Sequence, residues 1–218
     1  MTSMIDQNHA AEFERAWSDP ANTAIDFPPA DVNQVLRERY VLDRDLVYTR
    51  RLLWDMEVRK ASAPDLYIPS VVRPGSVRIW RSSRTAFTRV SEQRLWLRPH
   101  EFGVVIEHVY LDEQQQSVYF IGTAEYRTPN GQTIQAGSEQ PLFHVEHWVE
   151  AEEDRPVNRW RIVHLTPSPD QALLDRFTEM GRDPYLRDFI EVHMREVLGC
   201  TLTRKGGDRR PARVNHDF

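Results

Sequence analysis

Three histidines occupy equivalent places in strand-like segments of the sequence: His108, His147 and His164. The residues that alternate with them are Val104, Ile106 and Tyr110, then Phe143, Val145 and Val149, then Trp160, Ile162 and Thr166. Side chains alternate between the faces of a strand, so each histidine should share a face with these neighbours. If the three faces line one concavity, three imidazoles converge there. Because imidazole titrates near neutral pH, the pattern predicts a site for acid–base chemistry.

A carboxylate that orients the histidines is expected to come from a helix. By strand parity, Glu107, Glu125 and Glu146 point to the face opposite the histidines. The helical segment that precedes the strands offers Asp45 and Asp55 as the plausible positions. We therefore predict that one of these two aspartates accompanies the histidines.

Aromatic side chains share the predicted inward face. They are Phe120, Tyr126, Phe143 and Trp160, and their first role in such a place is to form the core, with pocket lining second. Tyr110 and Tyr126 carry hydroxyls that could donate a hydrogen bond to an oxyanion. The five residues are predicted to contact a hydrophobic substrate.

Each histidine is also consistent with a less specific role, as a half-buried sheet residue satisfied by hydrogen bonds or as part of a subunit interface. A metal site with three histidines is possible in geometry. However, the three lie on separate strands, and His144 belongs to the face opposite His147. The sequence also lacks a glycine-rich phosphate loop, a nucleophile elbow and a paired CxxC motif. We expect neither a bound metal nor a cofactor.

The composition is that of one globular domain with possible extensions. The 218 residues are 40% hydrophobic, with a net charge of −5 and a pI near 5.9, which gives no reason to expect nucleic acid as a partner. Cys200 is the only cysteine, so an intrachain disulfide is excluded and a reducing compartment is expected. No apolar stretch approaches the ~20 residues that cross a bilayer, and no signal peptide is recognised. We expect a cytoplasmic protein that has no membrane partner.

The periodicity predicts an α+β fold. One helix is expected at 5–17, and a bent helix or two abutting helices at 31–60, after the N-cap candidate Asp31. Strands are expected at 76–80, 86–96, 104–111, 118–127, 132–149 and 160–166, and the strand at 132–149 is expected to break near Gln140 and Pro141. The Asn-Gly pair at 130–131 predicts a type I′ hairpin turn.

Two further helices are predicted after the strands. The first starts at the N-cap candidate Ser168 and ends at Gly181, and the second runs from Asp183 to Gly199. The predicted divisions of the chain are an N-terminal appendage at 1–30, one α+β domain at 31–200 and a basic, disordered tail at 201–218.

The order of these elements resembles the nuclear transport factor 2-like superfamily. The hairpin YRTPNG at 126–131 and the closing strand WRIVH at 160–164 carry the resemblance, within a region that covers 31–166. It implies a cone: a strongly curved antiparallel sheet wrapped around a long N-terminal helix, with a pocket inside. The family houses ketosteroid isomerase-like enzymes, scytalone dehydratase, polyketide cyclases and non-catalytic subunits. The two C-terminal helices depart from its minimal pattern.

Two functions from different classes follow. The first is a cofactor-independent enzyme that dehydrates, isomerises or cyclises a hydrophobic, polyketide-like or aromatic small molecule by proton transfer. The second is a non-catalytic small subunit or association module, which binds a second copy or a larger partner subunit through its sheet and C-terminal helices. A closed cavity lined by histidine and aromatic residues would favour the first, and a cone filled by its own side chains the second.

Overall fold

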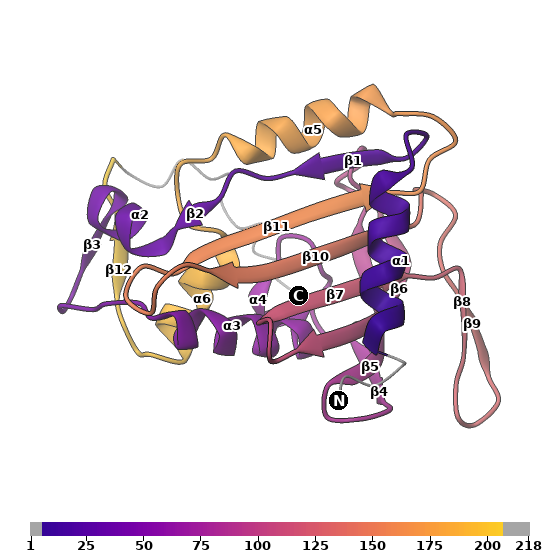
Figure 1. Ribbon diagram of the computed structural model, residues 1–218, viewed down its shortest axis with the longest axis horizontal. Helices are drawn as coiled ribbons and strands as arrows, with labels where there is room; N and C mark the ends of the chain where they lie inside the picture. Colours follow the sequence, from indigo (N-terminus) through magenta and orange to yellow (C-terminus); the bar gives the residue numbers. More distant parts are fainter. Residues whose placement is uncertain (1–5, 207–218) are drawn as a thin grey trace.

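The computed structural model describes residues 6–206 and confirms an α+β fold built on a curved antiparallel sheet (Figure 1). The strand order is β1-β11-β10-β7-β6-β5-β4, and β2 joins β11 beside β1. The strands of this sheet are β1 (Thr23–Asp26), β2 (Ala30–Asp31), β4 (Arg78–Arg81), β5 (Ala86–Arg94), β6 (Phe102–Asp112), β7 (Ser117–Gly122), β10 (Phe143–Glu150) and β11 (Val157–His164). Neighbours from β4 to β7 follow each other along the chain, so the meander predicted from the strand pattern is present.

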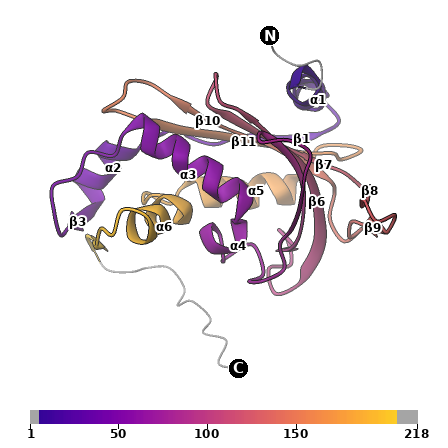
Figure 2. The same ribbon diagram turned by 90° about the horizontal axis from the view of Figure 1, so that it is seen from below.

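Helices cover both faces of the sheet, as Figure 2 shows. On the concave side lie α3 (Arg50–Ser62), α4 (Pro64–Tyr67), α5 (Gln171–Gly181) and α6 (Asp188–Glu196). On the convex side α1 (Asp6–Ser18) lies across the strands and buries Phe13 against them. In the part of the chain that the structure describes, no helix is both long and apolar enough to cross a bilayer.

The segment predicted as one helical unit at 31–60 is two helices that are well separated. The first, α2 (Val32–Arg39), ends where Tyr40 adopts an extended backbone and begins β3 (Tyr40–Leu42). A coil then leads to α3, which Thr49 caps by accepting a hydrogen bond from the backbone N–H of Leu52. The apolar pattern of 31–60 shifts its phase near Val41, and this shift marks a strand rather than a bend.

The chain on either side of the predicted domain is partly built into the fold. At the N-terminal end, β1 is an edge strand paired with β11, so residues 23–26 belong to the sheet. At the C-terminal end, β12 (Leu202–Arg204) pairs with β3, where a disordered tail was predicted. Residues 207–218 lie outside the described residues. The predicted division into appendage, domain and tail otherwise stays a prediction.

The long strand predicted at 118–127 divides into two. After Gly122 the chain leaves the sheet to form a separate hairpin of β8 (Glu125–Arg127) and β9 (Thr133–Gln135). A Cβ atom on Gly122 would lie 2.4 Å from the carbonyl oxygen of Phe143, so the strands can approach at this point only because residue 122 is glycine.

Three local expectations differ in detail from the structure. In the hairpin, Gly131 takes a φ of +86°, but Asn130 is not among the described residues with positive φ, so the turn is not type I′. The cap of α5 is Asp170, whose carboxylate accepts from two backbone N–H groups, rather than Ser168. The second C-terminal helix begins at Asp188, five residues later than predicted.

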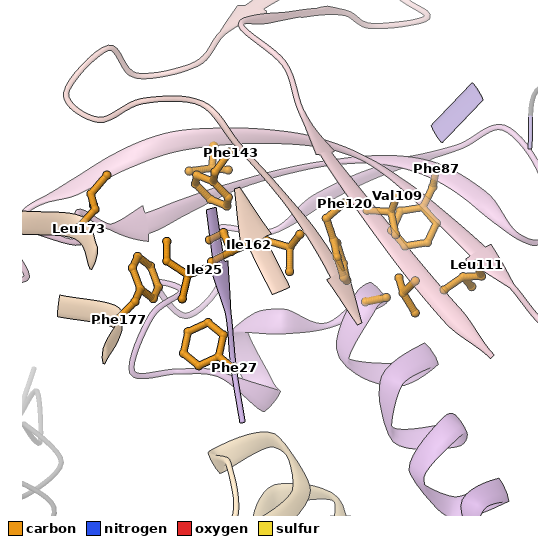
Figure 3. Close-up of a cluster of buried hydrophobic side chains, with 14 residues drawn as sticks. Ile25, Phe27, Phe87, Val109, Leu111, Phe120, Phe143, Ile162, Leu173 and Phe177 are labelled. Carbon is orange, nitrogen blue, oxygen red and sulfur yellow. The ribbon is translucent and has the colours of Figure 1, made fainter. Parts of the chain in front are cut away.

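The core inside the concavity is rich in aromatic rings, and Figure 3 shows its main members. Phe120 and Phe143 come from the sheet, Phe27 from the segment after β1, and Phe177 from α5. A second cluster joins α2, α3, α6 and β12, and includes Tyr48 and Leu202. The two clusters meet at Trp54 on α3, which packs against both.

A substitution at Leu202 tests whether β12 belongs to the folded body. The side chain is 6% exposed, and burial of this kind makes Leu→Ala costly. We expect Leu202→Ala to lower the free energy of unfolding by about 2–3 kcal/mol. Thr203→Ala, at the neighbouring exposed position, should change it by less than about 0.5 kcal/mol. Urea titration measures the free energy of unfolding of both variants. If both have the wild-type value, β12 contributes nothing to the stability of the fold.

Candidate functional site

The three predicted histidines do not converge, because His108 lies on the convex face of the sheet. Its ring packs near Tyr126 of the β8–β9 hairpin, and its Nδ1 lies 2.9 Å from Thr88 Oγ1. The neighbours Val105 and Val109, one residue out of phase, are the ones that enter the concave core. Strand β6 is apolar on both faces, since the hairpin covers the convex one, and for this reason the pattern did not reveal which face is concave.

His147 and His164 both lie on the concave side but at different ends of it. His164 packs against Phe143 and Phe177, whereas His147 packs against Phe120, Trp160 and Phe189. His164 pairs in register with Phe143, four residues along β10 from His147, which corresponds to about 13 Å. The two imidazoles therefore cannot act on the same atom.

A buried ionic cluster surrounds His147, and its other members come from α3. Lys60 Nζ lies 2.5 Å from Glu57 Oε2 and 2.9 Å from His147 Nδ1, and Glu57 Oε1 lies 3.3 Å from the same ring nitrogen. The amide of Asn158, on β11, donates a hydrogen bond to Glu57 Oε1 at 2.9 Å. We name these three residues, Glu57, Lys60 and His147, the ionic cluster. None of them is more than 6% exposed.

Burial and mutual charge set the protonation states of the ionic cluster. Burial lowers the pKa of His147, and the adjacent charge of Lys60 lowers it further, to about 4. For Glu57, burial alone would raise the pKa, but Lys60 and then His147 reverse the effect and hold it at about 2. Burial lowers the pKa of Lys60, and Glu57 opposes that shift. At neutral pH Glu57 is therefore a carboxylate and His147 a neutral imidazole.

The neutral imidazole fixes how the hydrogen bonds run. An ammonium can only donate, so Lys60 Nζ donates to an unprotonated Nδ1 of His147, and the ring proton is on Nε2. With Glu57 as the second partner, the third side of the ammonium faces the ring of Phe189, 4.1 Å from its centroid. Of the three contacts to Lys60, this cation–π contact is the easiest to replace, because the ring of Phe189 is neither charged nor a hydrogen-bond acceptor.

A second buried ion pair lies on the same concave face. Arg89, on β5, donates two hydrogen bonds to Glu107 Oε2, at 2.9 and 2.6 Å, and one to the carbonyl of Ala61. Its guanidinium also lies over the ring of Phe120. Glu107 was expected to face away from the site. The expected alternation along β6 is correct, but the concave face is the one on which Glu107 lies.

Neither of the predicted aspartates accompanies His147. Asp45 is exposed in the coil before α3. Asp55 is on α3 but two residues from Glu57, so it faces another side of the helix, where it pairs with Arg59 and with Nε2 of His193 at 3.0 Å. His193 in turn hydrogen-bonds the hydroxyl of Tyr48 at 2.6 Å, which ties α3 to α6 and to the coil before α3.

The predicted substrate-contacting residues divide between the two faces. Phe120, Phe143 and Trp160 line the concave side as expected. Tyr126 packs in the convex cluster with Trp80, and Tyr110 stacks on His9 of α1. The two tyrosine hydroxyls are therefore not available to a ligand on the concave side.

Glu57 and Lys60 were not among the predicted site residues. Their position could have been found from the helical phase, because Leu53, Met56 and Ala61 are the buried apolar residues of α3 and lie around the same face. The charged residues that fall inside this apolar stripe are the two that are buried. The alternation of side chains along β10 places His147 on the concave face. No sequence pattern indicates which face of α3 it contacts.

A small cavity of about 10 Å³ lies between β6 and the loop before β10, and it has room for about one water molecule. None of its lining residues belongs to the ionic cluster. Within residues 6–206, no three histidine, cysteine or acidic side chains are grouped so that they could hold a metal ion. A ligand at the ionic cluster would have to displace a side chain.

Comparisons with known proteins find resemblance in shape only. No family model matches the chain, and no curated protein matches it. Solved structures with a similar arrangement include the ZhuI aromatase/cyclase from Streptomyces sp. R1128, at 11% identity, 78% of this chain, 99% of that chain and a TM-score of 0.48. Ginseng major latex-like protein 151 from Panax ginseng is 11% identical, over 79% of this chain and 97% of that chain, with a TM-score of 0.47. Norcoclaurine synthase from Thalictrum flavum is 9% identical, over 90% of this chain and 92% of that chain, with a TM-score of 0.45.

With TM-scores below 0.5, these likenesses leave the chemistry to be argued from the residues of this chain. The curved sheet and the helices on its concave side, described above, show the cone-like arrangement directly. Membership of the nuclear transport factor 2-like superfamily itself stays a prediction.

The buried histidines should make the protein less stable in mild acid. Burial, followed for His147 by the charge of Lys60, lowers the pKa of His147 and of His164 to about 4 in the folded protein. Below the ordinary value of about 6.5 the unfolded chain binds more protons, so stability present above pH 6.5 is lost as the pH falls toward 4. Each histidine contributes a slope of up to about 1.4 kcal/mol per pH unit. His164→Phe should reduce the slope by that amount in urea titrations at several pH values, and an unchanged profile would contradict these states.

Removing one charge of the ionic cluster should cost more than removing two. Lys60→Met leaves the carboxylate of Glu57 buried without its main partner, and we expect a loss of about 3–5 kcal/mol in the free energy of unfolding. The double variant Glu57→Gln/Lys60→Met should recover most of that loss. Arg59→Met, on the exposed side of α3, is the control and should cost less than about 1 kcal/mol. Equal losses in the single and double variants would show that packing, not charge, sets the cost.

Proposed function

We propose that the protein is an enzyme that acts on an apolar, aromatic small molecule, and that Lys60 stabilises negative charge that develops on a substrate oxygen. Dehydration, isomerisation and cyclisation next to a carbonyl all develop such charge. The observation that carries the proposal is an ammonium buried on the concave face, with one side occupied only by an aromatic ring. Buried, strongly perturbed ionisable groups are concentrated at functional sites.

The ionic cluster holds Lys60 ready as a hydrogen-bond donor. Burial lowers the pKa of Lys60, and the carboxylate of Glu57, 2.5 Å away, opposes that shift and favours the protonated amine. His147 accepts one ammonium hydrogen and fixes the direction of the others. In this arrangement His147 positions Lys60, which differs from the role of proton acceptor that the sequence alone suggested.

The substrate oxygen takes the place that Phe189 now occupies. The ring of Phe189 covers Lys60 from α6 and also contacts His147 edge-on. When Phe189 swings aside, a carbonyl or hydroxyl oxygen can accept the third ammonium hydrogen. In a site that excludes water, such a bond to a developing oxyanion is stronger than in solution. The rings of Phe120 and Trp160, which flank His147, supply apolar contact for the body of the substrate.

A non-catalytic association module is the second candidate, and the observation in its favour is that the ionic cluster and the rings of Phe120 and Phe143 are all buried. Much of the surface that was predicted to bind a partner packs instead against other parts of the same chain. The stripe on the C-terminal helices is buried, with Leu173, Phe177, Phe189 and Ile190 all in the core clusters. On the convex side, α1 covers Val163 with Phe13. These parts of the predicted surface are therefore covered by the chain itself.

Turnover of aromatic carbonyl compounds by matched variants tests the proposal. We expect the neutral double variant Glu57→Gln/Lys60→Met to fold and to lose activity by about 100-fold or more, since it lacks the donor. His147→Gln should lower kcat with little change in KM, because it disturbs the orientation of Lys60 and not the apolar contacts. Arg59→Met, which removes an exposed cation one residue away, should keep wild-type activity. Full turnover by the double variant would refute the role of Lys60.

A further inference from the structure

Arg187 lies at the end of a row of rings that leads to the ionic cluster. It is the residue before α6, and its guanidinium carbon lies 5.7 Å from the ring centre of Phe27 and 5.9 Å from that of Trp160. These two rings stack on each other at 3.7 Å, and Trp160 stacks on His147 at 5.3 Å. The row therefore runs from Arg187 through Phe27 and Trp160 to His147, whose Nδ1 holds Lys60.

The guanidinium of Arg187 has donors to spare. Its Nη1 donates one hydrogen bond, at 2.8 Å, to the carbonyl of Met180 near the end of α5. Within residues 6–206 it forms no ion pair, although burial lowers its pKa and only Asp183 opposes that effect. A guanidinium carries five N–H donors in a planar fork that matches a carboxylate.

Three arginines that are buried or half-buried in the described part of the chain have carboxylate partners, whereas the half-buried Arg50 binds Gln116 and two backbone carbonyls instead. Arg89 pairs with Glu107, Arg161 with Glu146, and Arg204 with Glu191. A purely structural role for Arg187, as a cap of α5 that also covers the aromatic pair, uses one donor and the face of the guanidinium. It leaves the cost of partly desolvating the cation offset only by the charge of Asp183, which forms no ion pair with it.

We propose that Arg187 binds the carboxylate of the ligand, and that the substrates of this protein are aromatic acids. This inference rests on the proposed function, because it places one end of the same ligand. The ring of the acid lies against Trp160 and Phe27, the carboxylate pairs with the fork of Arg187, and the opposite end of the molecule extends toward Lys60. Two charges at the two ends of an aromatic row would then fix both the position and the direction of the substrate.

Matched pairs of aromatic compounds separate the contribution of the carboxylate from that of the rings. The probes are benzoate with benzamide and 2-naphthoate with 2-naphthamide, titrated into the full-length ¹⁵N-labelled protein. The indole N–H signal of Trp160 reports binding. We expect each acid to bind about 10- to 100-fold more tightly than its amide, which is the range for a hydrogen-bonded charged pair.

Two variants assign the preference to Arg187. Arg187→Gln should bind acid and amide equally, and its retained affinity for the amide shows that it is folded. Arg182→Gln removes an exposed arginine of the same loop and should keep the wild-type preference. Equal binding of acid and amide by the wild type, or a preference that survives Arg187→Gln, would overturn the role of Arg187 while leaving the aromatic site supported. No response of Trp160 to any of the four compounds would contradict both proposals.

Discussion

The arrangement of this protein depends on a lysine ammonium placed where water has almost no access. Removing a charge from water costs several kcal/mol, and the cost is offset only when partners are in place on every side. For Lys60 those partners are Glu57 on the same helix, His147 on β10 and Phe189 on α6. Helix α3 must therefore lie in the concavity with one definite rotation. The sheet must curve enough to bring β10 onto that helix, and α6 must close the third side.

Stability alone gives no reason to keep such charges. Well-packed apolar residues in the place of a buried ion pair are often as stable or more so, whereas breaking the pair by removing one partner is costly. The concave face nevertheless carries two such pairs, Lys60 with Glu57 and Arg89 with Glu107, and has Arg187 at its edge. A fold that directs cations into an aromatic interior is suited to a ligand with oxygen atoms at defined positions.

The sequence predicts the sheet better than it predicts the site. Strict alternation located β10 and β11 and assigned His147 and His164 to the concave face. It failed for His108, because β6 is apolar on both faces and the covering hairpin cannot be foreseen. Glu57 and Lys60 were missed because a charged residue within a helix usually faces water, although the helical phase places both on the apolar face of α3. Strand β12 was missed because its partner β3 interrupts what reads as helix.

The direct test of the central claim is the protonation and hydrogen bonding of His147, measured by ¹H–¹⁵N NMR of the imidazole at pH 7. The expected spectrum is that of a neutral ring with its proton on Nε2, and with Nδ1 accepting a hydrogen bond from a slowly exchanging Lys60 ammonium. A ring that is doubly protonated at pH 7, or one that titrates near its ordinary pKa without any coupling to Lys60, would contradict the account.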